Sequence, residues 1–105
     1  MSLPLSAESL SYESGVQPSI DCLSIAASAD PGVMPRVLEL FAKRGIVPSV
    51  WHSRVAGPYR DELTIDVQVA GLSRDEARHI AACLRQIPLV GSVLAYERQA
   101  GAADR

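Results

Sequence analysis

Residue types that mark metal sites and catalytic sites are scarce in this sequence of 105 residues. Its two cysteines, Cys22 and Cys83, lie far apart in apolar surroundings and lack the short spacings of zinc and redox sites. Such isolated thiols are typical of a protein interior. Neither His52 nor His79 is accompanied by a nucleophile in a pattern that would pair the two. The sequence therefore predicts no metal site, no catalytic residue and no enzymatic activity.

An excess of charge and long apolar runs are also missing. The 10 Lys and Arg residues against 12 Asp and Glu residues give a net charge of −2, which provides no general attraction to nucleic acid or to an anionic membrane. No apolar run approaches the length that spans a bilayer, and residues 1–15 lack the basic start and apolar run of a secretory signal. We therefore expect a cytoplasmic protein that contacts neither nucleic acid nor membrane.

The apolar residues that are present, 48% of the chain, suffice for a single core. Residues 1–18 are rich in Ser, Glu and Pro and show no clear periodicity, so we expect a flexible N-terminal extension. Residues 99–105 are small and polar, as in a C-terminal tail that frays. A single domain is therefore expected over residues 19–98.

The first half of this domain predicts a strand and a helix. Residues 20–27 alternate in the pattern of a strand with one buried face. After a turn, apolar residues follow at the spacing of one helical face: Met34, Val37, Leu38 and Phe41. Pro35 has no N–H and fits only the first turn of a helix, so the N-cap is Gly32 or a later residue. The basic residues before Gly45 predict that the helix ends near Arg44.

The second half begins with two strands and the start of another helix. Residues 46–55 favour a strand, and Pro48, which lacks an amide donor, predicts that this strand lies at a sheet edge. The sequence does not fix the pairing register of this strand, because Pro48 could create a bulge. Residues 62–69 alternate strictly between apolar and polar side chains, which indicates a strand. Ser73 and Glu76 form the S-x-x-E pattern of a capping box, which predicts a helix start.

The order of elements defines the expected fold. The helix that starts at the capping box ends before Pro88 and carries the apolar stripe Ala77, Ile80, Ala81, Leu84 and Ile87, and residues 90–97 form the last strand. The resulting βαββαβ order is typical of an α+β, ferredoxin-like sandwich, in which two helices cover one face of a four-stranded antiparallel sheet. Because the edge strands stay free, we expect a homodimer or higher oligomer through a sheet edge.

Other functions carried by this fold class find little support. The loop after the first strand has neither the Arg of small phosphatases nor the C-x-x-C of metal chaperones. Arg36 lies one turn into the helix, and we interpret it as a solvated or interface charge. RNA-binding versions display aromatic residues on central strands, where this chain has Ser24, Thr64 and Asp66.

The segment from Ala29 to Ile46 carries an acidic–Pro–Gly turn, an apolar helix and an Arg–Gly pair before the next strand. This arrangement resembles the signature of the ACT domain family, and in particular of the small regulatory subunit of acetolactate synthase (acetohydroxyacid synthase). The resemblance extends in order over residues 19–98. It implies a non-catalytic, cofactor-free protein of branched-chain amino acid biosynthesis that pairs side by side, binds an amino acid at the subunit interface and activates a large catalytic subunit.

The turn before the first helix is the candidate ligand site, with Asp30, Gly32, Val33 and Met34 as binding residues. At a helix N-terminus the three amides after Pro31 are expected to be free to bind a carboxylate, and Gly32 permits close approach. Asp30 is placed to pair with an ammonium group, so one turn would bind both ends of an amino acid. The alternative is that the turn only connects a strand to a helix.

Two positions depart from the family pattern. Ala29 and Val47 stand where valine-responsive small subunits usually carry Asn, and both changes remove polar ligand contacts. A small subunit that activates its partner without sensing an effector is therefore an alternative to a valine sensor. A second alternative is a free-standing amino-acid-binding homodimer that has no link to acetolactate synthase.

Overall fold

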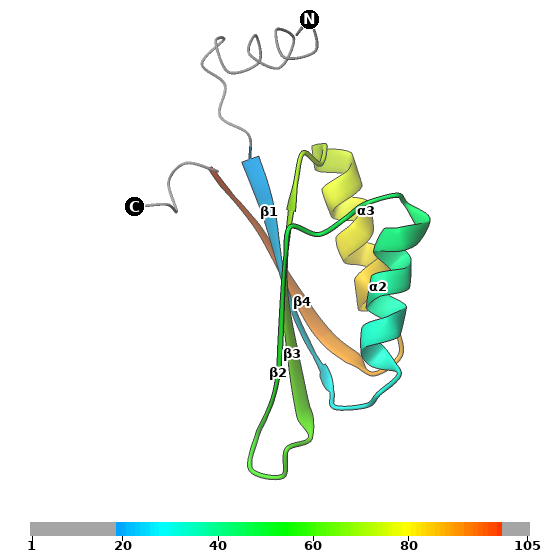
Figure 1. Ribbon diagram of the computed structural model, residues 1–105, viewed down its shortest axis with the longest axis vertical. Coiled ribbons are helices and arrows are strands. Elements are labelled where there is room, and N and C mark those ends of the chain that lie inside the picture. The colour runs from blue at the N-terminus through cyan, green and yellow to red at the C-terminus, as the bar shows by residue number, and fades with distance from the viewer. Residues whose placement is uncertain (1–18, 100–105) are drawn as a thin grey trace, which may run out of the picture.

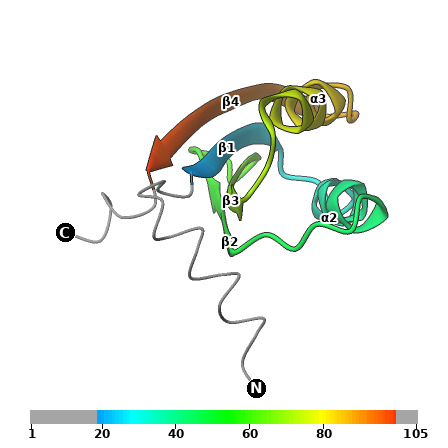
Figure 2. The same cartoon turned by 90° about the horizontal axis from the view of Figure 1, so that it is seen from above.

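The computed structural model describes residues 19–99, and the predicted N-terminal extension and most of the predicted tail lie outside this range. The elements follow the predicted order: β1 (Ser19–Ser28), α2 (Val33–Lys43), β2 (Val50–Ala56), β3 (Glu62–Ala70), α3 (Arg74–Arg85) and β4 (Val90–Gln99). The strands form one antiparallel sheet in the order β2-β3-β1-β4. Both helices lie on the same side of the sheet (Figures 1 and 2). The expected α+β, ferredoxin-like fold is confirmed.

The core lies between the helices and the sheet. The strict alternation of residues 62–69 places four apolar side chains of β3 on the helix side, all at most 3% exposed: Leu63, Ile65, Val67 and Val69. They meet Phe41 of α2 and Leu84 of α3, which are also fully buried. Burial of one such side chain contributes ~1.5–3 kcal/mol to folding, so this alternation fixes which face of the sheet the helices cover.

The helix ends follow the predicted signals. Gly32 is the N-cap of α2 and Arg44 its C-cap. At the start of α3 the capping box is complete: the Glu76 amide donates to Ser73 Oγ at 3.1 Å, and the Ser73 amide donates to Glu76 Oε1 at 3.0 Å. Both helices therefore begin where local sequence chemistry predicts.

The second strand is an edge strand, as predicted, but it begins later than predicted. The segment 46–49 lies outside β2, and the Ser49 amide donates to the carbonyl of Gln68 at 2.8 Å just before the ladder begins. Pro48 therefore precedes the ladder and creates no bulge, and β2 pairs with β3 without a shift from Val50 to Ala56. In the described sheet the register shift falls between Ala26 and Ala27, where β1 pairs with β4.

One ion-pair cluster joins α3 to the sheet. Asp21 of β1 is only 4% exposed, and both its carboxylate oxygens accept from Arg74 Nη2, at 2.6 and 2.8 Å. Arg74 Nη1 also lies 3.6 Å from Glu97 of β4. These bonds raise the pKa of Arg74, chiefly through the hydrogen bond to Asp21. The first turn of α3 is thereby tied to two neighbouring strands.

No element within residues 19–99 covers the face of the sheet away from the helices. On β4 it carries Leu94, 64% exposed, and Tyr96, 55% exposed. Cys22 of β1 is paired with Tyr96 and Gln68 on the flanking strands and is only 4% exposed. The prediction of a buried thiol is confirmed for Cys22, whereas Cys83 on α3 is only half-buried.

Candidate functional site

The turn between β1 and α2 is held by Asp30. The Gly32 amide donates to Asp30 Oδ1 at 2.8 Å, and the Val33 amide donates to the Asp30 carbonyl oxygen at 3.1 Å. A Cβ added at Gly32 would lie 3.3 Å from Asp30 Oδ1, so the absence of a side chain allows the carboxylate its close approach. The expectation that the Gly32 and Val33 amides are free is therefore wrong, because Asp30 already occupies both.

A small pocket of about 170 Å³ opens at this turn. Three of the four predicted site residues line it, and Met34 does not: it packs half-buried against the core. The remaining walls are Arg36 of α2 and the turn residues Pro88 and Leu89. The Ser28 amide donates to the Leu89 carbonyl at 3.0 Å, which holds the α3–β4 turn against the end of β1.

Sequence reasoning missed three of these lining residues. The sequence favours a solvated or interface charge for Arg36, although this residue follows Gly32 by four positions and so lies one helical turn above the N-cap. The spacing of four residues could have placed Arg36 at the pocket. No local sequence feature places Pro88 and Leu89 there, because they reach the pocket only through the pairing of β4 with β1.

Two side chains of opposite charge line this pocket. Among the described residues, Arg36 and Asp30 take part in no ion pair. Asp30 uses Oδ1 for the Gly32 amide, which leaves Oδ2 for a further donor. A guanidinium binds a carboxylate through two parallel hydrogen bonds, and a carboxylate binds an ammonium group. The pocket thus presents one binding group for each end of a zwitterion.

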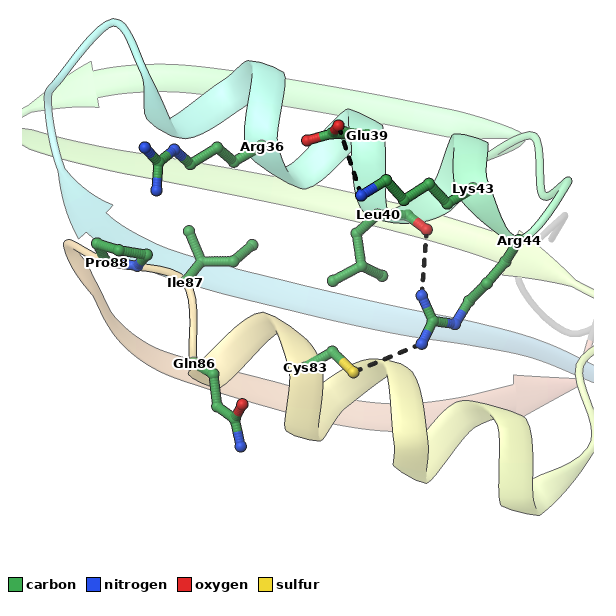
Figure 3. Close-up of a pocket in the computed structure, with 9 residues that line it drawn as sticks. All are labelled: Arg36, Glu39, Leu40, Lys43, Arg44, Cys83, Gln86, Ile87 and Pro88. Carbon is green, nitrogen blue, oxygen red and sulfur yellow. Dashed lines mark hydrogen bonds and ion pairs between the residues drawn. The ribbon is translucent and has the colours of Figure 1, made fainter.

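A larger groove of about 470 Å³ runs between α2 and α3 and shares Arg36 and Pro88 with the small pocket (Figure 3). Leu40 and Ile87 point into it from opposite sides, which gives it an apolar floor next to Arg36. Along the α2 side, Glu39 pairs with Lys43 at 3.6 Å. The two cavities therefore adjoin at Arg36 and Pro88, and the groove has Arg36 at one end, Lys43 and Arg44 at the other, and the apolar strip of Leu40 and Ile87 between them.

The small pocket alone has a smaller volume than an ordinary ligand site. Pockets that enclose a small molecule usually measure ~300–1,000 Å³, whereas this one measures about 170 Å³ and its walls are largely exposed residues. The described residues cover a ligand held there on one side only. A second chain against this surface would supply the missing wall.

Two further properties hold for the described residues. Within residues 19–99, no three His, Cys, Asp or Glu side chains gather closely enough to hold a metal ion. No helix in the same range has the length and apolar character needed to cross a bilayer.

Comparison with solved structures agrees with this architecture. The ACT domain from GTP pyrophosphokinase of Chlorobium tepidum superposes with a TM-score of 0.64 at 13% identity, over 75% of this chain and 99% of that one. The C-terminal domain of the MgtC protein from Mycobacterium tuberculosis gives 0.63 at 16% identity, over 83% and 95%. The regulatory subunit of aspartate kinase from Thermus thermophilus gives 0.58 at 20% identity, over 79% and 52%. At these identities the likeness shows the fold.

Sequence comparison supplies the family. No curated protein sequence is significantly similar to the chain. A family model described as an ACT-like domain matches residues 19–101, which includes every described strand and helix. The chain belongs to the ACT-like domain family.

Proposed function

We propose that this protein is a regulatory domain that binds a free amino acid in the pocket at the start of α2. ACT domains are in general regulatory domains that bind amino acids. The observation that carries the proposal here is the pair of opposite charges, Asp30 and Arg36, which line the same pocket without ion-pair partners in the described structure.

The roles follow from this geometry. Because Asp30 occupies the Gly32 and Val33 amides, the guanidinium of Arg36 replaces the turn amides as the group that binds the ligand carboxylate. Asp30 Oδ2 then accepts from the ligand ammonium group. Asp30 thus has two functions, since one oxygen shapes the turn and the other contacts the ligand.

The apolar strip favours one class of amino acid. From Arg36 the surface continues over Pro88 to Leu40 and Ile87, and the acidic side chain that lines this groove, Glu39, is paired with Lys43. A ligand bound by its charged ends at Arg36 extends its side chain along this strip. Since Arg36, Lys43 and Arg44 also line this groove, we expect aliphatic amino acids, branched-chain ones among them, to bind better than basic ones.

The proposed partner is the large catalytic subunit of an acetolactate synthase, and this non-catalytic chain would regulate it in the cytoplasm. The support is the resemblance of the segment from Ala29 to Ile46 to small subunits of that enzyme. Ala29 and Val47 lack the polar groups of valine-responsive small subunits, and Val47 is 85% exposed. Binding of valine itself would therefore rest on Asp30 and Arg36 and not on polar groups at those two positions.

A free-standing homodimer is the second candidate. Its support is the incomplete pocket together with the outer edges of β2 and β4, which no other strand within residues 19–99 pairs. Pairing of two chains through a sheet edge would bring a second surface to the pocket. In that arrangement the protein senses an amino acid without a fixed catalytic partner.

A thermal-shift screen of the full chain against the twenty amino acids tests the binding proposal. A ligand at 100 times its dissociation constant adds about 2.7 kcal/mol of stability, so a ligand produces a clear rise in the unfolding temperature. Arg36→Gln should abolish that rise, whereas Arg54→Gln on the far face of the sheet should leave it unchanged. No rise with any amino acid would contradict an amino-acid site in the isolated chain.

Partner choice is tested separately by affinity capture from the source cell. Recovery of a thiamine-diphosphate-dependent catalytic subunit would support the link to acetolactate synthase. A chain that is recovered alone, and that sediments as a dimer, would favour the free-standing sensor.

A further inference from the structure

Cys83 lies in a cluster of groups that the proposed function does not use. Its Sγ atom lies 3.5 Å from His79 Nε2, one turn earlier in α3, and accepts from Arg44 Nη2 at 3.6 Å. The side chain is half-buried and faces the groove between the helices, as Figure 3 shows for Cys83 and Arg44. A half-exposed sulfur with an imidazole and a guanidinium beside it is the setting of a reactive thiol.

The groove around this sulfur is positively charged. Three cationic side chains line it, Arg36, Lys43 and Arg44, against one carboxylate, that of Glu39. Glu39 pairs with Lys43 at 3.6 Å, and the described structure provides no carboxylate partner for either arginine. The groove measures about 470 Å³, within the ~300–1,000 Å³ of small-molecule sites. It therefore suits a small anion that approaches the sulfur.

We propose that Cys83 is a modification site that forms a mixed disulfide with an anionic, carboxylate-bearing thiol of low molecular weight. The reacting partner is the disulfide form of that thiol, which acts as the oxidant. Arg36 and Arg44 bind its carboxylates, so one sulfur of its S–S bond is brought to Cys83.

The exchange is balanced without any other reactant. The Cys83 thiol transfers its proton to His79 Nε2, and Sγ attacks the nearer sulfur of the incoming disulfide. The incoming S–S bond breaks as the new one forms, and the other half leaves as a thiolate, which takes up the proton. Arg44 stabilises the negative charge on the attacking sulfur during the displacement.

The second thiol of the chain provides the contrast. Cys22 is 4% exposed on the opposite face of the sheet, between the paired residues Gln68 and Tyr96. The sheet separates it from the groove, because both helices lie on the other side of the sheet (Figures 1 and 2), so the two cysteines of one chain do not meet in the folded state. Reaction of the native protein is therefore expected at Cys83 alone.

The test compares two disulfide probes that differ in charge, oxidised glutathione and cystamine. The full chain with Cys22→Ser is incubated with each, modification is followed by intact mass, and peptide mapping locates it. The quantity compared is the rate with oxidised glutathione divided by the rate with cystamine. We expect this ratio to be about tenfold higher in the folded chain than in the same chain in denaturant, which corresponds to ~1.4 kcal/mol. Added salt should reduce this preference.

Variants separate the roles of the surrounding groups. Arg44→Gln should remove most of the preference for the anionic probe, and His79→Asn should slow both probes equally, while Arg54→Gln on the far face should change neither rate. Circular dichroism confirms that each variant is folded. A rate ratio equal to that of the denatured chain, a preference for cystamine, or modification of Cys22 ahead of Cys83 in the wild-type chain would each overturn the proposal.

Discussion

At the scale of single residues, Asp30 shows how one side chain serves both structure and binding. Its Oδ1 atom accepts from the Gly32 amide at 2.8 Å, so the carboxylate shapes the turn before α2. Asn keeps an acceptor at this position but loses the negative charge, whereas Ala loses both. Comparison of the two substitutions therefore separates the turn from the ligand.

Asp30→Ala should destabilise the fold by ~1 kcal/mol, the usual effect of losing a side-chain bond at a helix start. Asp30→Asn should change stability by less than half of that, because the acceptor remains, yet should weaken amino-acid binding as much as Asp30→Ala does. Denaturant unfolding and calorimetry measure the two effects. Equal ligand affinity for wild type and Asp30→Asn would contradict the role given to the charge.

Tyr96 permits a second prediction at this scale. The pKa of Tyr96 is raised, chiefly by the nearby Cys22, whose negative charge at high pH opposes that of the phenolate. Because the folded state favours the neutral phenol, this contribution to stability is present below the ordinary tyrosine pKa and is lost as the pH rises through the raised one.

Cys22→Ala should therefore move the titration of Tyr96 down towards the ordinary tyrosine pKa. Phenolate absorbance followed against pH measures this shift, and a background with Tyr12→Phe and Tyr59→Phe removes the signals of the other two tyrosines of the chain. A titration curve of Tyr96 that is unchanged by Cys22→Ala would show that the cysteine is not the cause.

The candidate site was predictable only in part at this scale. Asp30, Gly32 and Val33 could be located because the acidic–Pro–Gly turn and the helix start are local signals. The occupation of the amides by Asp30 depends on turn geometry that composition does not specify. Leu89 joins the pocket only when β4 pairs with β1, and contacts between segments so distant in sequence leave no pattern in either one.

At the scale of elements, the helices were the most predictable because their starts are marked by side chains that satisfy backbone donors. Ser73 and Glu76 indicate the start of α3, and the structure contains both hydrogen bonds of the box. The second strand was less predictable, since Ile46 and Val47 have the side chains of a strand but lie before the ladder. Ile46 instead donates its amide to the Phe41 carbonyl at the end of α2.

Removal of the capping box is the prediction for this scale. Ser73→Ala should reduce the free energy of unfolding by ~1 kcal/mol, because the Glu76 amide loses its acceptor. Ser73→Asp, which keeps an acceptor next to the helix N-terminus, should restore most of the loss. Chemical unfolding of the three proteins measures this, and equal stability of Ser73→Ala and wild type would rule out a role for the cap.

At the scale of the whole molecule, one ion-pair cluster connects the helix layer to the sheet in addition to the hydrophobic core. Arg74 at the start of α3 bonds Asp21 of β1 and lies near Glu97 of β4, so a single guanidinium spans a helix and two strands. Asp21 is buried, and without this partner it would retain an uncompensated charge in the interior.

Arg74→Gln should therefore lower the unfolding temperature far more than Arg78→Gln, although the two arginines are neighbours on the same helix. Arg78 pairs with Asp75 in an exposed i,i+3 contact, and exposed pairs of this kind contribute little. Adding Asp21→Asn to the Arg74→Gln protein should recover part of the loss, because it removes the buried charge. A similar unfolding temperature for Arg74→Gln and Arg78→Gln would argue against the cluster as a link between layers.

The central position of β1 has a consequence for engineering. Because β1 pairs with β4, Ser19 lies directly opposite Gln99, and such partners on antiparallel strands have Cα atoms about 4.5–5.5 Å apart. A short Gly-Ser linker can join these two positions, and the turn between β2 and β3 can be opened to give a circularly permuted domain. For the same reason the domain can be inserted into a surface loop of a fluorescent protein without separating the ends of that loop. Any change in shape on ligand binding would then be transmitted to the host as an optical signal.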